Sequence, residues 1–391
     1  MQTAYIVGGY RTAVTKSKRG GFRFLRPDDL AVKVIQGLLA SIPQLDPLLI
    51  DDVIVGNAVP EAEQGLQVGR IIANRAIGET TAGFTINRYC GSGLEAIAIA
   101  TAKIQNGMAD CIIAGGTESM SLVPTAGWRT VPNYEYTSEN GDYYLSMGLT
   151  AEQVAADFKI TRQAQDEFSL RSHQKALNAI KEGYFKEGIL PVTVKEVYLN
   201  ELNKKAEREL VIDTDEGPRA DTSVDALGKL PAVFAQGGSV TAGNSSQTSD
   251  GAAFTIVMSE QLMNQLGLKP LGRLINCASA GVDPRIMGIG PVKAVPKVLK
   301  QAGMTLNDID LIELNEAFAS QSLAVIGELG LNPDIVNING GAISLGHPLG
   351  CTGAKLTIQL LSDLKRLNKK YGIVTACIGG GQGIAGIIER Y

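Results

Sequence analysis

Short apolar runs bounded by glycine alternate along the chain with longer segments of helical periodicity. Strand-like runs span 50–58 and 309–317, and each follows a helix-like segment, at 30–39 and 292–302. Alternation of this kind is typical of sheets whose faces are covered by helices. We therefore predict an α/β fold.

The same elements recur in the same order in both halves of the chain. The strand-like run at 109–116 resembles the one at 371–380, just as the two runs above resemble each other. Between them, Ile86-Asn87 before a turn and a helix corresponds to Ile338-Asn339 before a glycine-rich turn and a helix at 355–364. Three matches in register, offset by roughly 260 residues, predict an internal duplication.

A more polar segment separates the two halves. A helix is predicted to begin after Thr161, whose hydroxyl can cap it, and the charged run at 200–210 is predicted to be a solvated loop or hairpin. The predicted division of the chain is a first half of residues 1–120 and 251–268, an inserted domain of residues 121–250, and a second half of residues 269–391.

Charge and hydropathy exclude some classes of partner. The net charge of −4 argues against nucleic acid, because phosphate backbones are bound by surplus Lys and Arg. No uninterrupted apolar run is long enough to span a bilayer, so no membrane span is expected. Residues 1–9 resemble a first strand and lack the features of a secretory signal. We therefore expect a cytoplasmic protein.

The cysteines and histidines do not predict a metal site. The five cysteines are an odd number and include no CxxC pair, which argues against a disulfide framework or a zinc site. There are only two histidines, and His173 is expected at the surface of a charged helix. Cys111, Cys277 and Cys351 are interpreted as packing residues.

Cys90 is the first candidate for chemistry. It lies between a strand-like run at 83–86 and an apolar helix-like run at 94–100. A cysteine at the start of a helix is exposed to the positive end of the helix dipole and to free backbone N–H groups, both of which favour the thiolate. Cys90 is therefore a candidate nucleophile, and the alternative is a buried structural thiol.

A nucleophile needs a base and a group that stabilises an oxyanion. His347 lies in a glycine-rich segment at 340–350 that is the second-half counterpart of the Cys90 turn. If the halves pack about a pseudo-twofold axis, the two turns can meet and the imidazole can reach the thiol. The alternative is a structural histidine, which is the commoner role for a lone one.

Two further residues lie at the ends of predicted strands. Cys377 precedes a glycine-rich turn that includes Gly379, and the N–H groups of such a turn can bind an oxyanion. Asn315 closes a strand at its carboxyl end, where ligands gather in α/β sheets. The alternatives are a turn that only connects two strands and an asparagine that caps a helix.

Four segments together resemble the signatures of the thiolase family, and the resemblance covers essentially the whole chain. They are Asn87–Gly93 (NRYCGSG), Asn315–Phe318 (NEAF), Gly340–Pro348 (GGAISLGHP) and Cys377–Gly381 (CIGGG). The chain is most similar to the degradative 3-ketoacyl-CoA thiolases. The resemblance implies a five-layered α-β-α-β-α core built from two duplicated halves, with an inserted loop domain.

The resemblance also implies catalytic roles. Cys90 would carry the acyl group as a thioester, and His347 would take its proton. Cys377 would protonate the departing acetyl-CoA carbanion and then deprotonate the incoming CoA. Asn315 would hold a water beside one oxyanion, and the Gly379 N–H would help to hold the other.

Coenzyme A is the implied substrate, with no permanently bound cofactor. The residues implied to contact CoA or the acyl-CoA are Arg219, Ser246, Met147, Phe234, Met287 and Phe318. For the last four, an ordinary core position is the alternative. Two positions depart from the pattern of some family members, since Ser146 replaces a histidine and Ala226 replaces a serine that contacts CoA.

The predicted function is cleavage of 3-ketoacyl-CoA by CoA in fatty-acid β-oxidation. The absence of a histidine at position 146 argues against specificity for the short acetoacetyl unit and favours a longer acyl chain. The alternatives are an acetoacetyl-CoA thiolase in the condensing direction and a catalytically inactive lipid-binding relative. A decarboxylating ketosynthase is disfavoured by the thiol of Cys377. A homodimer or homotetramer is expected, and docking onto a multifunctional β-oxidation enzyme is left open.

Overall fold

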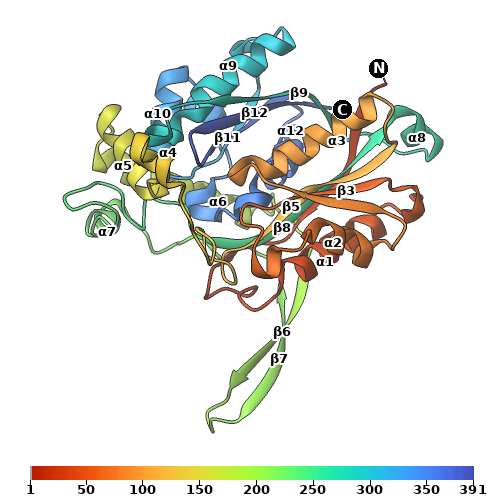
Figure 1. The fold of residues 1–391 in the computed structure, drawn as a ribbon, viewed down its shortest axis with the longest axis horizontal. Coiled ribbons are helices and arrows are strands. Elements are labelled where there is room, and N and C mark those ends of the chain that lie inside the picture. The colour runs from red at the N-terminus through yellow and green to blue at the C-terminus, as the bar shows by residue number, and fades with distance from the viewer. Residues whose placement is uncertain (1) are drawn as a thin grey trace.

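The computed structural model describes residues 2–391, and its strands form one ten-stranded mixed sheet and a separate hairpin (Figure 1). The strands of the first half are β1 (Ala4–Arg11), β2 (Thr15–Lys16), β3 (Asp52–Gly56), β4 (Ala82–Ile86), β5 (Cys111–Ser119) and β8 (Ser249–Ser259). Those of the second half are β9 (Gly272–Gly281), β10 (Leu311–Leu314), β11 (Tyr371–Ile378) and β12 (Gln382–Arg390).

The strand order repeats about the middle of the sheet. It runs β4-β3-β5-β8-β1 in the first half and β10-β11-β12-β9 in the second, and the halves join where Ile6 of β1 pairs with Gly272 of β9. The parallel pairing of β3 with β5 corresponds to that of β10 with β11. This repeat confirms the duplication that the sequence predicts.

Equivalent hydrogen bonds anchor the parallel strands in each half. In the first half, the Asp51 N–H donates to the Cys111 carbonyl at 2.9 Å, and the Cys111 N–H donates to the Asp51 carboxylate at 3.1 Å. In the second half, Asp310 and Tyr371 form the same pair of bonds, both at 2.9 Å. The aspartate that precedes each strand therefore fixes its register in the same way.

Helices form three layers around the two half-sheets. The helices of the core are α1 (Pro27–Ala40), α2 (Val68–Ala76), α3 (Ser92–Gln105), α9 (Gly290–Ala302), α10 (Ala319–Leu329) and α12 (Thr352–Arg366). Helices α1 and α2 pack on the outer face of the first half-sheet, and α9 and α10 pack on that of the second. Helices α3 and α12 lie between the half-sheets. This is the predicted five-layered α-β-α-β-α core.

The two central helices approach each other closely at glycine. A Cβ placed on Gly353 of α12 would lie 2.2 Å from the Leu94 nitrogen of α3, and one on Gly93 would lie 2.7 Å from the Ala354 nitrogen. Such distances leave no room for a side chain. The two glycines therefore set the depth at which the helices pack, and with it the separation of the turns at their N-termini.

The inserted segment forms helices and a projecting hairpin. Its elements are α4 (Tyr134–Glu139), α5 (Met147–Asp157), α6 (Arg162–Lys181), β6 (Val192–Leu199), β7 (Lys205–Ile212) and α7 (Val224–Gly228). As predicted, Thr161 caps α6 by accepting from the Ala164 N–H at 3.2 Å. The charged run at 200–210 forms the turn and second strand of the hairpin, which extends away from the body of the molecule (Figure 1).

The two remaining α-helices are short, α8 (Glu260–Gln265) and α11 (Ala342–Leu345). Among residues 2–391, no helix combines the length and the apolar character needed to cross a lipid bilayer.

Candidate active site

The turns that precede the two central helices meet at the centre of the molecule. Cys90 lies in a single helical turn, η3 (Tyr89–Gly91), directly before α3. The equivalent turn before α12 is η8 (Leu349–Cys351), which follows His347. The first turn packs against the second and against the end of β11, which carries Cys377. The duplication therefore brings three of the predicted catalytic residues to one place.

The hydrogen bonds of His347 define which ring nitrogen carries the proton. The buried imidazole places Nδ1 at 2.6 Å from the hydroxyl oxygen of Thr352, and this hydroxyl donates its own proton to the Pro348 carbonyl at 2.9 Å. The hydroxyl therefore accepts from Nδ1, which must be protonated. Nε2 keeps its lone pair and can act as a base.

Asn315 lies beside that base. Its side-chain nitrogen is 3.3 Å from Nε2 of His347, and its backbone N–H donates to the Thr375 carbonyl at 2.9 Å. The side-chain oxygen of Asn315 is buried and has no partner within residues 2–391. A buried amide oxygen normally has a hydrogen bond, so this oxygen is a position where a water or a substrate group can bind.

Burial determines the protonation of Cys90 more strongly than the helix terminus does. Burial raises the pKa of the Cys90 thiol to about 12, although the backbone N–H groups of Cys90 and Gly379 act in the opposite direction. The side chain is only partly buried, so solvent moderates the effect. The thiolate expected from the sequence is therefore not the resting form, because desolvation outweighs the dipole and the N–H groups.

The other two titratable groups are neutral as well. Burial, reinforced by the neighbouring Cys90, raises the pKa of the Cys377 thiol. Burial and then the charge of Lys355 lower the pKa of His347 to about 3. Within residues 2–391, the Cys90 thiol forms no hydrogen bond with the imidazole. The site thus rests as two thiols and a neutral imidazole, which is suited to moving protons during a reaction.

The apolar residues implied by the resemblance gather next to these groups. Met287 and Phe318 are buried in one cluster with Cys377, and Met147 packs against it. The rings of Phe234 and Phe318 are 6.1 Å apart in an edge-to-face arrangement. These residues therefore form a continuous apolar wall that begins at the Cys377 thiol.

Ser246 and Arg219 lie outside this cluster. Ser246 is partly buried, and its N–H donates to the Ala317 carbonyl at 2.9 Å. The Arg219 side chain is 61% exposed and pairs with Asp221 at 3.2 Å. Its guanidinium is therefore accessible to an anionic ligand in solution.

The prediction that His173 is a surface residue is wrong. Its side chain on α6 is only 5% exposed, and Nδ1 accepts from the Arg219 N–H at 3.2 Å. The polar face of α6 is buried against other polar groups, for example where Ser172 donates to the Glu316 carboxylate at 2.7 Å. Hydropathy alone cannot distinguish a polar helix face that is buried in this way from a solvated one.

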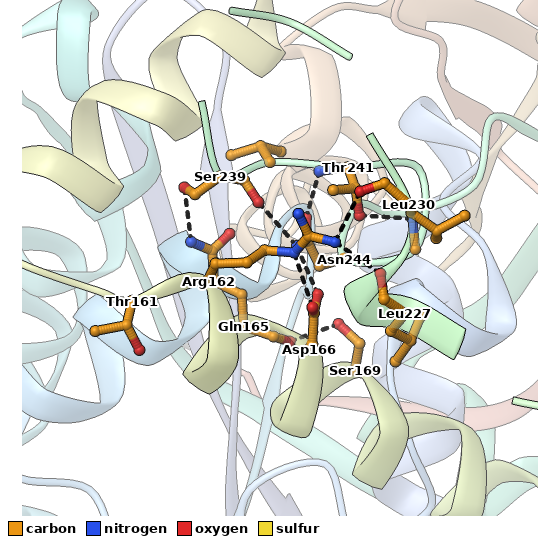
Figure 2. A network of polar contacts seen from close by, with 12 residues as sticks. Thr161, Arg162, Gln165, Asp166, Ser169, Leu227, Leu230, Ser239, Thr241 and Asn244 are labelled. Carbon is orange, nitrogen blue, oxygen red and sulfur yellow. Dashed lines mark hydrogen bonds and ion pairs between the residues drawn. The ribbon is translucent and has the colours of Figure 1, made fainter. Parts of the chain in front are cut away.

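A polar network holds the segment that leads to Ser246 (Figure 2). Arg162 pairs with Asp166 at 2.8 Å and also donates to the carbonyls of Leu227 and Leu230, at 2.6 and 2.9 Å. Asp166 in turn accepts from the Asn244 amide at 3.0 Å. Helix α6 therefore fixes both α7 and the loop that carries Ser246.

Sequence reasoning missed Glu118, which ties the segment after β3 to the turn that follows His347. This fully buried carboxylate accepts from the N–H groups of Ala58 and Gly350 and from the side chain of Gln64, each at 2.8 Å. Gly350 belongs to the turn that follows His347. A charged residue near the end of the fully buried strand β5 was the available signal, because buried carboxylates occur only where they are paired or hydrogen-bonded.

Two family models match the chain in succession: the thiolase N-terminal domain over residues 4–261 and the thiolase C-terminal domain over residues 268–390. Together they cover nearly the whole sequence, and the boundary between them falls between β8 and β9.

Several proteins are similar over their full length. A 3-ketoacyl-CoA thiolase of Bacillus subtilis (strain 168) is 50% identical over 390 residues, with 100% of both chains covered. A 3-oxoadipyl-CoA/3-oxo-5,6-dehydrosuberyl-CoA thiolase and an acetyl-CoA acetyltransferase, both of Escherichia coli (strain K12), are 43% and 41% identical, again with 100% of both chains covered.

A solved structure shares the fold. The crystal structure of the Bacillus anthracis acetyl-CoA acetyltransferase superposes with a TM-score of 0.90 at 39% identity, covering 100% of this chain and 99% of that one. With the family models and the full-length relatives, this shows that the chain belongs to the thiolase family of acyltransferases.

Proposed function

We propose that this protein is a 3-ketoacyl-CoA thiolase of fatty-acid β-oxidation. It cleaves 3-ketoacyl-CoA with CoA to give acetyl-CoA and an acyl-CoA shortened by two carbons. The observation that carries the proposal is the meeting of Cys90, His347 and Cys377 at one apolar site. The 50% identical relative named 3-ketoacyl-CoA thiolase supports this choice of substrate.

In the first half-reaction, Nε2 of His347 takes the Cys90 proton as the sulfur attacks the 3-keto carbon. The bond between C2 and C3 then breaks. The Cys377 thiol gives its proton to C2, so that acetyl-CoA leaves and Cys377 becomes a thiolate. The remaining acyl group stays on the Cys90 sulfur as a thioester.

The second half-reaction restores the enzyme. The Cys377 thiolate takes the proton of an incoming CoA, whose sulfur attacks the acyl thioester. As the shortened acyl-CoA forms, the Cys90 sulfur leaves and recovers its proton from the His347 imidazolium. No proton is gained or lost over the cycle, so no further acid or base is needed.

Two oxyanions need stabilisation in this scheme. The enolate oxygen of the leaving acetyl-CoA is stabilised by the protonated His347 and by a water bound to Asn315. The side-chain oxygen of Asn315 is available for that water, because it is buried and has no partner among residues 2–391. The oxyanion on the acyl carbon is stabilised by hydrogen bonds from the N–H groups of Cys90 and Gly379. Loss of one such donor typically costs about 3–4 kcal/mol in the barrier.

Coenzyme A is assigned to the inserted segment and the adjoining apolar wall. We place its adenosine phosphate near the exposed Arg219 and its pantetheine along Ser246, Phe234 and Phe318. The domain division given above, a homodimer or homotetramer, a cytoplasmic location and docking onto a multifunctional β-oxidation enzyme remain predictions from the sequence.

A chain-length series tests the proposed function. Thiolysis is measured with 3-ketoacyl-CoA substrates from acetoacetyl-CoA to long-chain members, for the wild type and for Cys90→Ala. We expect turnover across the series by the wild type and none by the variant. Mass spectrometry of the wild type, quenched after mixing with substrate, should find the acyl group on the peptide that contains Cys90.

The second candidate is an acetoacetyl-CoA thiolase that works in the condensing direction. It is favoured by the likeness to two acetyl-CoA acetyltransferases, one known from its crystal structure. Activity confined to acetoacetyl-CoA would select this candidate. Wild-type protein without thiolysis or condensation activity would contradict both and leave a lipid-binding role.

A further inference from the structure

Four tyrosines gather at the glycine turn that follows Cys377. We call them the tyrosine cluster: Tyr89, Tyr136, Tyr143 and Tyr144. Tyr143 lies at the centre, with ring centroids 5.1 Å from Tyr136 and 5.0 Å from Tyr144, both edge to face. Tyr143 and Tyr144 belong to the turn η4 (Gly141–Tyr144), directly after α4. Tyr89 precedes the candidate nucleophile, and its ring borders the same glycine turn.

The cluster contacts the turn where the chemistry is proposed. A Cβ placed on Gly380 would lie 3.1 Å from the hydroxyl oxygen of Tyr143. One placed on Gly379 would lie 3.7 Å from the Tyr89 ring and 3.5 Å from the Met147 sulfur. The turn after Cys377 is thus bordered both by Met147, which belongs to the apolar wall, and by the tyrosine cluster.

A 3-ketoacyl-CoA extends in two directions from its reacting carbon. One arm carries CoA, and the proposed function assigns it to the apolar wall at Phe234 and Phe318. The other arm is the acyl chain, which needs a second apolar surface at the same turn. The tyrosine cluster provides one that is still open, since Tyr89, Tyr136 and Tyr144 are 44%, 38% and 42% exposed.

The cluster lacks positive charge at its ring faces. Within residues 2–391, no Lys or Arg lies over any of its four rings, although seven other aromatic rings have such a cation. The only charged side chain in η4 is the acidic Asp142. Two arginines lie nearby, Arg88 before Tyr89 and Arg285 in η5 (Pro284–Ile289), which packs against η4. Each is already paired with a carboxylate, Arg88 with Glu95 at 2.9 Å and Arg285 with Asp157 at 2.8 Å. A carboxylate at the end of an acyl chain would therefore lose hydration here without gaining an unpaired cationic partner.

We propose that the tyrosine cluster, centred on Tyr143, receives the acyl chain and selects apolar chains, those ending in an aromatic ring above all, over chains ending in a carboxylate. This inference rests on the proposed function and names the class of substrate within it. An aryl end group suits the cluster because edge-to-face contacts between rings add to the apolar area that is buried.

The test compares three CoA thioesters of equal acyl length, with a methyl, a phenyl or a carboxylate end, and takes acetoacetyl-CoA as the short reference. For the wild type, we expect kcat/KM to be highest with the phenyl end and lowest with the carboxylate end. In Tyr143→Ala, the ratio of kcat/KM for the phenyl substrate to that for acetoacetyl-CoA should fall about tenfold. Tyr143→Phe, which keeps the ring, should retain the wild-type ratio.

Tyr134→Ala is the matched control. Tyr134 lies in α4, close to the cluster in sequence, but it is 85% exposed and is not part of the cluster. Its substrate ratios should equal those of the wild type.

Three outcomes would overturn the inference. The first is a wild type that prefers the carboxylate substrate, and the second is a Tyr143→Ala variant whose activity falls equally with every substrate. The third is a change of oligomeric state in that variant without a change in substrate ratios, which would assign the cluster to subunit contact. In all three the wild type still cleaves 3-ketoacyl-CoA. A wild type that cleaves none of the substrates would overturn the proposed function itself.

Discussion

The hydroxyl of Thr352 fixes the tautomer of His347. It lies 2.6 Å from Nδ1 and donates its own proton to the Pro348 carbonyl, so it can only accept from the ring. Both residues are buried, so water does not compete for these bonds. The base nitrogen, Nε2, is thereby left unprotonated, and it accepts from the Asn315 side-chain amide at 3.3 Å.

Thr352→Val should impair proton transfer while leaving the fold intact, because valine keeps the shape of threonine and removes the acceptor for Nδ1. We expect kcat to fall about tenfold to a hundredfold, as a buried donor left without a partner costs about 1–3 kcal/mol. Thr352→Ser keeps the hydroxyl and should remain within a few-fold of the wild type. Equal kcat values for the valine and serine variants would contradict this role.

Cys90 should titrate at unusually high pH. Burial raises the pKa of its thiol from an ordinary 9.0 to about 12. The folded enzyme therefore keeps the Cys90 proton at pH values where a free cysteine is already deprotonated. The difference in ultraviolet thiolate absorbance between the wild type and Cys90→Ala should therefore be absent below pH 9 and appear only above pH 9. Cys111→Ala should give a similar difference curve, since burial raises that thiol pKa to about 12 as well. A Cys90 midpoint below pH 8 would show instead that the helix N-terminus dominates.

The close approach of α3 and α12 predicts that Gly353→Ala is destabilising. The added methyl group would lie 2.2 Å from a backbone nitrogen, and backbone cannot move aside as a flexible side chain can. We expect a loss of about 1–3 kcal/mol in the free energy of unfolding, measured by denaturant titration. Gly327→Ala in α10 is the control, because its new methyl group would meet nothing within 4 Å among residues 2–391 apart from its own helix backbone, and alanine favours the helix. A Gly353→Ala protein as stable as wild type would mean that the helices can separate at no cost.

Glu118→Gln should weaken the brace between the segment after β3 and the turn that follows His347. A carboxylate only accepts hydrogen bonds, whereas the glutamine amide would turn an NH2 group towards at least one of the existing donors, such as the N–H of Gly350. We expect a loss of about 1–3 kcal/mol in stability together with a lower kcat. The exposed Glu135→Gln removes the same charge and should change neither quantity. An active, fully stable Glu118→Gln enzyme would contradict the brace.

Local patterns in the sequence determined the architecture and the candidate residues. The recurring strands and the Thr161 cap are set by side-chain periodicity and by short-range backbone preferences. The four signatures pointed to Cys90, Asn315, His347 and Cys377 because each lies at the end of a predicted strand or in a turn. All of these features are fixed by neighbours along the chain.

Only the tertiary structure decided how those residues behave. The neutral state of Cys90 follows from desolvation by distant segments, and the tautomer of His347 depends on a hydroxyl that points to it in the folded turn. The burial of His173 and the brace at Glu118 likewise require contacts between elements far apart in sequence. Hydropathy depends only on the type of side chain, whereas burial and hydrogen bonding depend on which residues the fold places around that side chain.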